Sequence, residues 1–203
     1  MADLVTREKW DKAARNFDLM AGGGAEARWK PHKQKLFAHM RGRILFLALG
    51  TGLDIPTFPP GQDINAIDIS PKMLAQAKDR IAAYDGRIVA EVMDVHEMPF
   101  PEGSFDQVFT SCTFCSVPRP VEGLKALRRV LRPGGELFMF EHTGSRYLPF
   151  KPMMDLMTLF SQRMGPAMNR RTVDNVRKAG FRITEVENLF LDVVKTIKAV
   201  NPR

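Results

Sequence analysis

The 203-residue chain contains little cysteine and no long apolar run. Two cysteines cannot build a disulfide framework, and no apolar stretch approaches the roughly 20 residues that cross a bilayer. The N-terminal sequence MADLVTREKWDKAARNF has no apolar signal-peptide core, so we expect a cytoplasmic location. With 44% apolar and 26% charged residues, the chain is typical of one globular domain with a small appendage.

Acidic residues are missing between Arg28 and Arg43, where the chain carries six Lys or Arg. The overall net charge is +7, and it is distributed unevenly: residues 1–43 carry +5, residues 44–160 carry −3 and residues 161–203 carry +5. Basic ends favour an anionic partner, either a lipid surface or a nucleic acid. A basic surface that meets only water would show the same pattern.

The N-terminal residues 1–43 are predicted to form two amphipathic helices, over 4–20 and 25–41, separated by AGGG at 21–24. Aromatic side chains lie among their basic residues, at Trp10, Phe17, Trp29 and Phe37. A helix at a membrane interface needs this combination of apolar face, basic rim and aromatics. We therefore expect these helices to contact an anionic membrane surface at its inner face. The alternative is that they only cover the active site.

Short apolar runs alternate with amphipathic segments from residue 44 onward. Strands are predicted over 43–49, 64–69, 88–94, 105–112 and 136–142, and helices over 70–84 and 120–135. Further helices are predicted over 150–165 and 171–181, and a closing antiparallel pair over 182–190 and 193–200. This order predicts an α/β domain over 44–203, with a doubly wound, mostly parallel seven-stranded sheet and the N-terminal helices as a lid.

A glycine is missing from the turn that follows the first strand. The turn reads LGTG at 49–52, but Ala48 stands where cofactor-binding turns often have a first glycine, and Phe46 where an acid is common. Gly50 and Gly52 would still let a ligand lie against bare backbone. Taken alone this motif is weak, because an ordinary turn explains it as well.

Two acids at the ends of later strands strengthen the cofactor interpretation. Asp68 ends the second strand, where a carboxylate can hold a ribose diol, and Asp94 ends the third strand, where it could accept from an adenine amino group beside Val95. The carboxyl ends of parallel strands meet at one edge of a sheet, so the turn and both acids would share a site. Helix capping is an alternative for Asp68, although Ser70 already serves as the cap. An exposed strand end is the alternative for Asp94.

The order of these motifs resembles the class I S-adenosylmethionine-dependent methyltransferases over residues 10–200. The resemblance lies in LGTG, IDIS, MDVHEMPFPEGSFDQV and LRRVLRPGGELFMFEH. Parts of these segments resemble ubiquinone-biosynthesis methyltransferases, and CTFCSVPRP resembles membrane-associated thiol methyltransferases. The chain also resembles the Rhodobacter-type phosphatidylethanolamine N-methyltransferases, the branch whose function we expect here.

The resemblance implies S-adenosylmethionine as the cofactor and a binding role for matching positions. The glycine turn would meet the methionine part, Asp68 the ribose, Asp94 the adenine, and the residues after the fourth strand the sulfonium side. The departures at Phe46 and Ala48 put one contact to the amino group in doubt. The implied cofactor-binding residues are Trp10, Phe17, Ala48, Gly50, Thr51, Gly52, Asp68, Ile69, Met73, Asp94, Val95, Ser111 and Cys112.

A single CxxC motif, CTFC at 112–115, has no second pair of ligands, so we expect no metal. It follows a strand and does not open a helix as redox motifs do, which indicates a place in the cofactor pocket or the core. Methyltransferases of nucleobase amino groups resemble one another in an Asn/Asp-Pro-Pro-aromatic motif at this place. This chain lacks that motif, so we expect no nucleic acid partner.

Methyl transfer to an amine requires a positioned nucleophile with a free lone pair. Candidates to accept the proton are Glu141 and His142 at the end of the fifth strand, Tyr147 beyond it, and Asp18 on the lid. Structural roles are equally open for Glu141 and His142, and Tyr147 could instead form an aromatic wall with Phe17. Candidates to contact a phosphate are Arg146, Lys151 and Arg170.

The expected function is S-adenosylmethionine-dependent N-methylation of phosphatidylethanolamine and its methylated intermediates, toward phosphatidylcholine, by a protein bound peripherally to the membrane. The motives beyond resemblance are the acids at strand ends and the basic, aromatic terminal helices. The alternative is a soluble methyltransferase that acts on a quinone or a thiol. A cofactor-binding protein without enzymatic activity is the third hypothesis.

Overall fold

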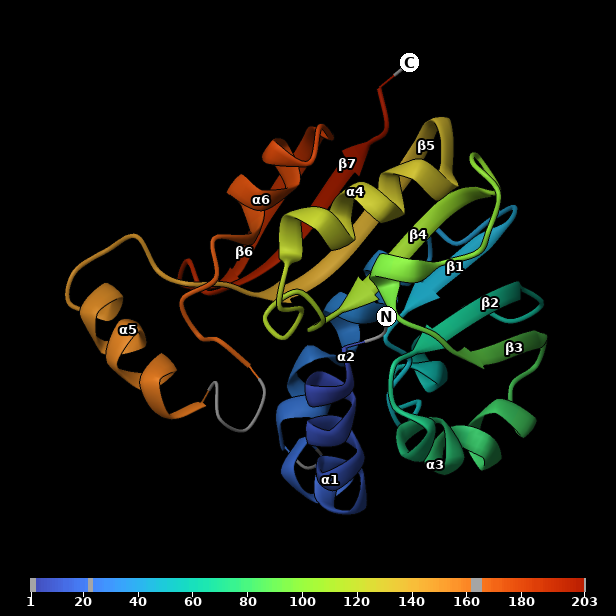
Figure 1. Cartoon of the computed structure of the whole chain (residues 1–203), viewed down its shortest axis with the longest axis horizontal. Helices are drawn as coiled ribbons and strands as arrows, with labels where there is room; N and C mark the ends of the chain where they lie inside the picture. The colour runs from blue at the N-terminus through green and yellow to red at the C-terminus, as the bar shows by residue number, and fades with distance from the viewer. Residues whose placement is uncertain (1–2, 22–23, 162–165, 203) are drawn as a thin grey trace.

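The computed structural model describes residues 3–21, 24–161 and 166–202. One seven-stranded sheet has the strand order β3-β2-β1-β4-β5-β7-β6 (Figure 1). All pairings from β3 to β5 are parallel, and β7 runs antiparallel to both β5 and β6. The predicted fold class is therefore confirmed. The strands are β1 (Ile44–Leu47), β2 (Asp63–Asp68), β3 (Arg87–Val92), β4 (Phe105–Ser111), β5 (Leu131–His142), β6 (Arg182–Phe190) and β7 (Val194–Val200).

The helices are α1 (Leu4–Ala21), α2 (Gly24–Phe37), α3 (Pro71–Ala82), α4 (Pro120–Val130), α5 (Phe150–Ser161) and α6 (Thr172–Lys178). At the start of α3 the Ser70 hydroxyl accepts the Met73 N–H at 3.1 Å, as expected of a cap. The helix predicted over 120–135 ends earlier, at Val130, and Leu131 already pairs with Phe105 of β4. Pro133 disfavours a helical conformation of the residue before it, which prevents the longer helix. The predicted end of the α5 helix, 162–165, lies outside the described residues.

Each face of the sheet carries its own apolar layer. Successive residues of β1 point to opposite faces, so Leu45 and Leu47 pack against α4 and α6 while Ile44 and Phe46 pack on the side of α2 and α3. In Figure 1, α4 and α6 lie in front of the sheet. Burial on both faces explains why this strand reads as an unbroken apolar run.

Phe46, the residue found in place of an acid, belongs to this core. Its ring lies 5.7 Å from the ring of Phe37 and 4.9 Å from that of Phe58, measured between centroids. Leu36 and Phe37 of α2 are buried in the same layer. The N-terminal segment and the sheet thus share a core, and the predicted domain boundary at residue 43 stays a prediction.

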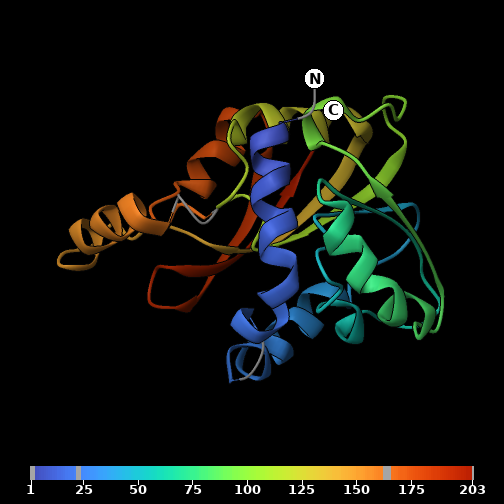
Figure 2. The same cartoon turned by 60° about the horizontal axis from the view of Figure 1, so that its bottom comes forward.

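The carboxyl-terminal edge of the sheet is covered unevenly. Figure 2 shows α1 running across the molecule in front of the strands, whereas α5 stands away from the sheet at one side in both views. In the described part of the chain, no helix combines the length and apolarity needed to cross a bilayer.

Candidate cofactor-binding site

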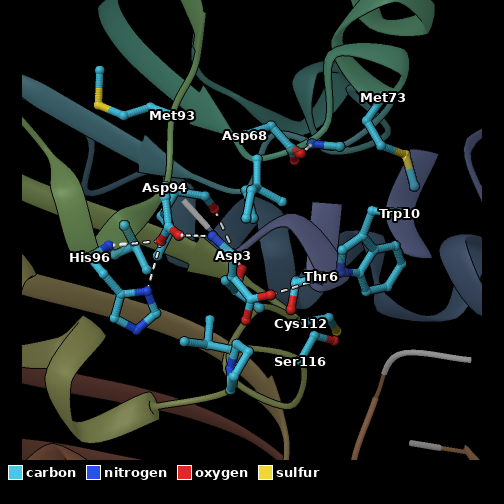
Figure 3. Close-up of a pocket in the computed structure, with 18 of the residues that line it drawn as sticks. Asp3, Thr6, Trp10, Asp68, Met73, Met93, Asp94, His96, Cys112 and Ser116 are labelled. Carbon is cyan, nitrogen blue, oxygen red and sulfur yellow. Dashed lines mark hydrogen bonds and ion pairs between the residues drawn. The ribbon is translucent and has the colours of Figure 1, made fainter. Parts of the chain in front are cut away.

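A cavity of about 150 Å³ lies between α1 and the carboxyl ends of β1, β2, β3 and β4 (Figure 3). Thr51 and Gly52, two of the predicted cofactor residues, are not part of its wall. The predicted residues that do line it are Trp10, Phe17, Ala48, Gly50, Asp68, Ile69, Met73, Asp94, Val95, Ser111 and Cys112. The structure therefore gathers most of the predicted cofactor residues around one space.

The two glycines of the turn, Gly50 and Gly52, have different structural roles. Gly50 has φ +60°, and a Cβ added there would meet no atom within 4 Å, so the space beside it is open to a ligand. At Gly52, with φ +81°, a Cβ would come within 2.9 Å of Ile55 Cδ1 and 3.3 Å of Ala77 Cβ. Gly50 lets a ligand approach the backbone, whereas Gly52 lets the turn pack against α3.

Ala48 occupies the left-handed region of backbone space, with φ +59°. This conformation costs a residue with a Cβ roughly 1–2 kcal/mol relative to glycine. A glycine at this position would adopt the same backbone conformation without this cost. The chain keeps that conformation with alanine, because Ala48 N–H donates to Ile67 O at 2.8 Å and holds the turn against β2.

Asp68 joins the glycine turn to the start of α3 at the base of the cavity. Its Oδ2 accepts the Gly50 N–H at 2.8 Å and its Oδ1 accepts the Ser70 N–H at 2.8 Å. Burial raises the pKa of this carboxyl, and the two N–H donors oppose that rise. Each carboxylate oxygen has a second lone pair, so both can still accept from a pair of adjacent hydroxyls.

Asp94 lies between His96 and the start of α1, as Figure 3 shows. Its Oδ1 lies 2.7 Å from His96 Nδ1 and accepts the His96 N–H at 2.9 Å, while its Oδ2 accepts the Asp3 N–H at 3.0 Å. Burial opposes ionisation, but the hydrogen bonds from His96 and Asp3 outweigh it and lower the pKa of the carboxyl. An adenine amino group would have to share an oxygen with these donors or displace one of them.

Helix α1 is fastened over the cavity by its acids. Asp11 Oδ1 accepts from the Ser70 hydroxyl at 2.5 Å. Asp18 accepts from the Thr51 hydroxyl at 2.5 Å and from Arg80 Nη2 at 2.8 Å. Both oxygens of Asp18 thus hold α1 to the glycine turn and to α3, and its role as a proton acceptor stays a prediction.

Glu141 lies outside the wall of this cavity, and its catalytic role stays a prediction. It is fully buried, and its Oε1 accepts from the Thr110 hydroxyl at 2.9 Å and from Thr113 N–H at 3.2 Å, while its Oε2 accepts from Phe114 N–H at 3.1 Å. Burial raises the pKa of Glu141 to about 7, and these three donors oppose the rise. Through these bonds Glu141 holds the loop after β4 in place.

His142 and Tyr147 also lie outside the wall of this cavity. His142 is half-buried, its Nδ1 has no partner in the described structure, and burial lowers the pKa of its ring. Tyr147 is exposed, and the Phe17 ring meets Trp10 at 6.0 Å. The expected wall of Phe17 and Tyr147 is therefore not formed here, and a catalytic role for His142 or Tyr147 stays a prediction without a contact to support it.

The two cysteines of the CTFC motif lie in the cavity wall and in the core. Cys112 lines the cavity, and its N–H donates to Phe140 O at 2.7 Å. Cys115 is buried, its thiol donates to Cys112 O at 3.2 Å, and burial raises its pKa to about 12. The thiol of Cys115 is thus protonated at neutral pH, and both cysteines shape the loop, as expected.

The structure adds residues that the motifs did not indicate. Asp3 caps α1 by accepting the Thr6 N–H at 3.0 Å, and both residues line the cavity. Met93 and His96 flank Asp94, and Ser116 belongs to the loop after β4. Extending each strand-end motif by a few residues would have found Met93, His96 and Ser116. No sequence signal showed that the first turn of α1 reaches the cavity.

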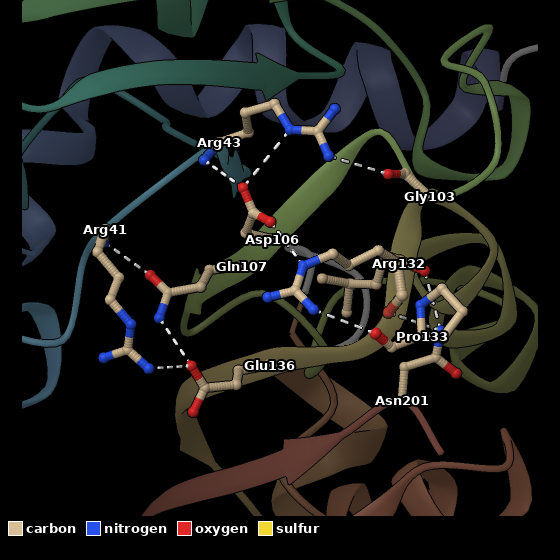
Figure 4. Close-up of polar contacts among 10 residues, drawn as sticks. Arg41, Arg43, Gly103, Asp106, Gln107, Arg132, Pro133, Glu136 and Asn201 are labelled. Carbon is tan, nitrogen blue, oxygen red and sulfur yellow. Dashed lines mark hydrogen bonds and ion pairs between the residues drawn. The ribbon is translucent and has the colours of Figure 1, made fainter. Parts of the chain in front are cut away.

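The opposite edge of the sheet, where the parallel strands begin, has a structural polar network (Figure 4). Buried Gln107 accepts the Arg41 N–H at 2.8 Å and donates to Glu136 at 3.0 Å. Asp106 accepts from Arg132 Nε at 2.6 Å. These bonds join β4 and β5 to the segment before β1. The network therefore lies at the edge of the sheet opposite the cofactor cavity.

Comparison with known proteins also indicates a methyltransferase. The family model of a methyltransferase domain matches residues 45–139. A ubiquinone/menaquinone biosynthesis C-methyltransferase of Geotalea daltonii is 32% identical over 71% of this chain and 66% of its own length. A thiol S-methyltransferase of Homo sapiens is 34% identical over 57% of this chain and 52% of its own. A phosphatidylethanolamine N-methyltransferase of Cereibacter sphaeroides is 29% identical over 66% and 68%.

The chain thus spans about half to two thirds of the length of these curated relatives. Among solved structures, an N-methyltransferase of Haemonchus contortus in complex with phosphomonomethylethanolamine and S-adenosylhomocysteine superposes with a TM-score of 0.71. It is 19% identical, and the match covers 98% of this chain and 61% of that one. This likeness supports the fold.

The residues around the cavity match the chemistry of S-adenosylmethionine. It has open space beside the Gly50 backbone, a buried carboxylate at Asp68, and apolar walls that include Ile69, Met73 and Val95. These features match a ribose with an adjacent adenine and thioether. The chain thus contains a methyltransferase domain over residues 45–139 with the class I fold, and S-adenosylmethionine is its cofactor.

Proposed function

We propose that the chain methylates the amine of phosphatidylethanolamine and of its methylated intermediates, toward phosphatidylcholine, at a membrane surface. The observation that carries this proposal is the position of the cofactor cavity on the same sheet edge as α5, a helix with exposed apolar side chains. The similarity to a phosphatidylethanolamine N-methyltransferase supports it.

When bound, S-adenosylmethionine supplies an electrophilic methyl group. The chain's own residues bind and orient: Asp68 accepts from hydroxyls, while Trp10 and Phe17 on α1 cover the cavity. Ser111 and Cys112 line the side reached through the loop after β4. Glu141 fixes that loop through Thr113 and Phe114 and is thus a positioning residue.

The apolar wall of the cavity, and not a dedicated base, favours the loss of the proton from the acceptor amine. None of the four predicted proton acceptors belongs to the cavity lining in the described part of the chain. An apolar surrounding disfavours an ammonium relative to the neutral amine. The amine therefore releases its proton to water as it enters, and positioning supplies the remaining rate enhancement.

Membrane contact is part of the same proposal, with a change in the element that provides it. In α2, Leu36 and Phe37 are buried and Trp29 packs on Phe140 at 5.9 Å, so the predicted apolar face points inward. In α5, by contrast, Met153, Leu156, Met157, Leu159 and Phe160 are exposed. We propose that α5 enters the interface of the inner membrane leaflet, while the basic residues of α1 and α2 add attraction to anionic lipid.

The alternative function is transfer to a soluble quinone or thiol. It is favoured by the apolar cavity wall around Met93 and Val117, which would suit an acceptor without a headgroup. The similarity to a quinone-biosynthesis and a thiol methyltransferase supports it. Nucleic acid is not part of either proposal.

One assay separates these functions. The protein is incubated with methyl-labelled S-adenosylmethionine and phosphatidylcholine vesicles, with or without phosphatidylethanolamine, and in parallel with a demethylated quinone or an alkyl thiol. We expect label in lipid only when phosphatidylethanolamine is present. Label only in the quinone or the thiol would establish the alternative. Absence of label everywhere, with cofactor binding intact by calorimetry, would indicate a cofactor-binding protein without this activity.

A further inference from the structure

A second cavity, of about 460 Å³, lies beside the first at the carboxyl end of β5. Its wall comes from the loop after β5, the first turns of α5, the segment before α6, the first turn of α6, and β7. The two cavities are neighbours: Arg170 lines the second, and its Nη2 donates at 3.1 Å to the carbonyl of Val117, which lines the first. Five cationic side chains line this second cavity: Arg146, Lys151, Arg170, Arg171 and Lys195.

The acids of this cavity do not balance its cations. Only two carboxylates belong to its described wall, Asp155 and Asp174. Asp174 is already shared, because its oxygens lie 2.8 Å from Arg171, 3.3 Å from Arg177 and 3.6 Å from Arg146. One carboxylate thus meets three guanidinium groups, which leaves hydrogen-bond donors for another anion.

Asp155 meets one cation and one amide. It accepts from Lys151 Nζ at 2.9 Å and from Asn169 Nδ2 at 3.0 Å. A fourth cation, Arg170, turns Nε and Nη2 toward the backbone carbonyls of Cys115 and Val117. A guanidinium has five N–H donors, so Arg170 can still donate from its other nitrogen.

Lys195 and Arg146 raise the positive potential at one end of this cavity. Lys195 Nζ donates to Asn188 at 2.5 Å, and behind it Asp192 accepts from Arg146 N–H at 2.7 Å and from the Ser145 hydroxyl at 2.6 Å. Burial lowers the pKa of Lys195, Asp192 opposes this, and the charge of Arg146 adds to it. An anion placed among these groups would relieve the repulsion between the two cations.

We propose that this second cavity is a binding site for a phosphate group carried as a monoester or a diester. Arginine guanidinium groups match phosphate oxygens in a two-point geometry, and the lysine adds a compact charge. The phosphate can come from a lipid headgroup, since α5 forms one wall and presents its apolar side chains next to it, or from a soluble phosphate ester. The site goes beyond the proposed methyl transfer and stands whether or not a lipid is the methyl acceptor.

Calorimetry with inorganic phosphate and with phosphoethanolamine, at constant ionic strength in chloride, tests the site. We expect Arg146→Gln and Arg171→Gln, at exposed positions that tolerate the change, each to weaken binding about tenfold, because each removes charge-assisted donors. Arg177→Gln is the matched control: Arg177 meets the same Asp174 from outside the cavity, so its loss should change affinity less than about twofold. Thermal melts verify that all three variants fold.

Equal affinities for phosphate in wild type, Arg146→Gln and Arg171→Gln would overturn the proposal, as would phosphate binding no better than chloride. Lys195→Gln gives an independent check from another element, with the same expected loss. A failed methyl-transfer assay leaves this result unaffected, because phosphate binding is measured without S-adenosylmethionine.

Vesicles distinguish the two sources of phosphate once the soluble ligands bind. Flotation with phosphatidylglycerol vesicles is compared for Arg146→Gln and Arg177→Gln, which remove the same charge. A larger loss for Arg146→Gln supports a lipid headgroup in the cavity. Equal losses, together with a specific effect on phosphoethanolamine, support a soluble phosphate ester.

Discussion

The two halves of the carboxyl-terminal sheet edge differ in what covers them. Over β1 to β4, α1 closes an apolar cavity and is held by Asp11, Asp18 and the N–H of Asp3. Beside β5 and β7, α5 borders a cationic cavity, and only Met154 and Thr158 of that helix are buried. The sequences of α1 and α5 are both amphipathic. The apolar face of α1 packs against the protein, whereas that of α5 is exposed.

This difference teaches that an apolar face does not by itself indicate a membrane contact. The α1 helix carries acids at positions that meet Ser70, Thr51 and Arg80, so its docking is specified by polar contacts across the interface. In α5, the polar bonds of Lys151 and Asp155 remain within the helix and its neighbouring segment. The closed half would bind the cofactor and the open half would bind what arrives from outside.

The largest expected effect is on the closed half. Asp68→Ala should weaken binding of S-adenosylhomocysteine about 100-fold or more, because it removes the acceptors for the ribose and releases the Gly50 turn. Calorimetry measures it, and Asp63→Ala, an exposed acid at the start of the same strand, is the control. Unchanged affinity of the Asp68 variant would refute the assignment of this cavity.

The next effect concerns Glu141, at the boundary of the two halves. Its folded pKa of about 7 lies above the ordinary value of 4.5, so the stability that it contributes is complete below pH 4.5 and is lost as pH rises through 7. The shift corresponds to about 3 kcal/mol. Urea unfolding at pH 5 and pH 8 should show this loss in wild type and a smaller one in Glu141→Gln. An identical pH dependence of both proteins would show that Glu141 is ionised throughout.

The open half is tested by its exposed apolar residues. Leu156 and Phe160 are 58% and 66% exposed on α5, and Leu4 and Leu19 are 56% and 84% exposed on α1. Replacing Leu156 and Phe160 by Ser should lower partitioning to anionic vesicles about tenfold or more, because their burial in the interface is lost. Replacing Leu4 and Leu19 by Ser is the matched control. If only the α1 pair lowers partitioning, the N-terminal helices are the membrane anchor after all.

A smaller effect is expected from removing the hydrogen bonds that hold α1 over the cavity. Asp18→Ala should weaken cofactor binding about threefold to tenfold, because the hydrogen bonds to Thr51 and Arg80 are partly exposed to solvent. Hydrogen exchange should show faster exchange in α1 of this variant than in Glu8→Ala, which changes an exposed acid of the same helix. Equal protection in the two variants would show that Asp18 does not hold the lid.

The smallest effect is at the unusual residue of the turn. Ala48→Gly should raise the free energy of unfolding by about 0.5–1 kcal/mol, because glycine adopts φ +59° without strain and the added freedom of the unfolded chain offsets only part of that gain. Urea unfolding measures it, and Ala126→Gly on α4 should lower stability instead. A loss of stability at residue 48 would show that the Ala48 methyl group contributes packing that outweighs the strain.

Local patterns predicted the sheet, and together with the family resemblance they predicted most of the cavity lining. The apolar run around Phe46 predicted a strand buried on two faces, and Asp68 and Asp94 predicted the site, because parallel strands bring their carboxyl ends together. The proton acceptors could not be predicted in this way. Whether Glu141 faces a cavity or accepts N–H groups of a neighbouring loop depends on how β4 and β5 pack, which no pattern within β5 reports.

The sequence by itself determined the fold class, since periodicity acts over a few positions, and the resemblance of its motifs to a known family indicated the type of cofactor. Only the tertiary structure decided which amphipathic helix remains exposed. It alone also brought Arg146, Arg171 and Lys195 to one cavity, from a loop, a helix start and a strand. The physical reason is that packing partners and charge balance arise between segments distant in the chain. The charge of a segment follows from its own residues, but the charge of a cavity depends on which segments fold around it.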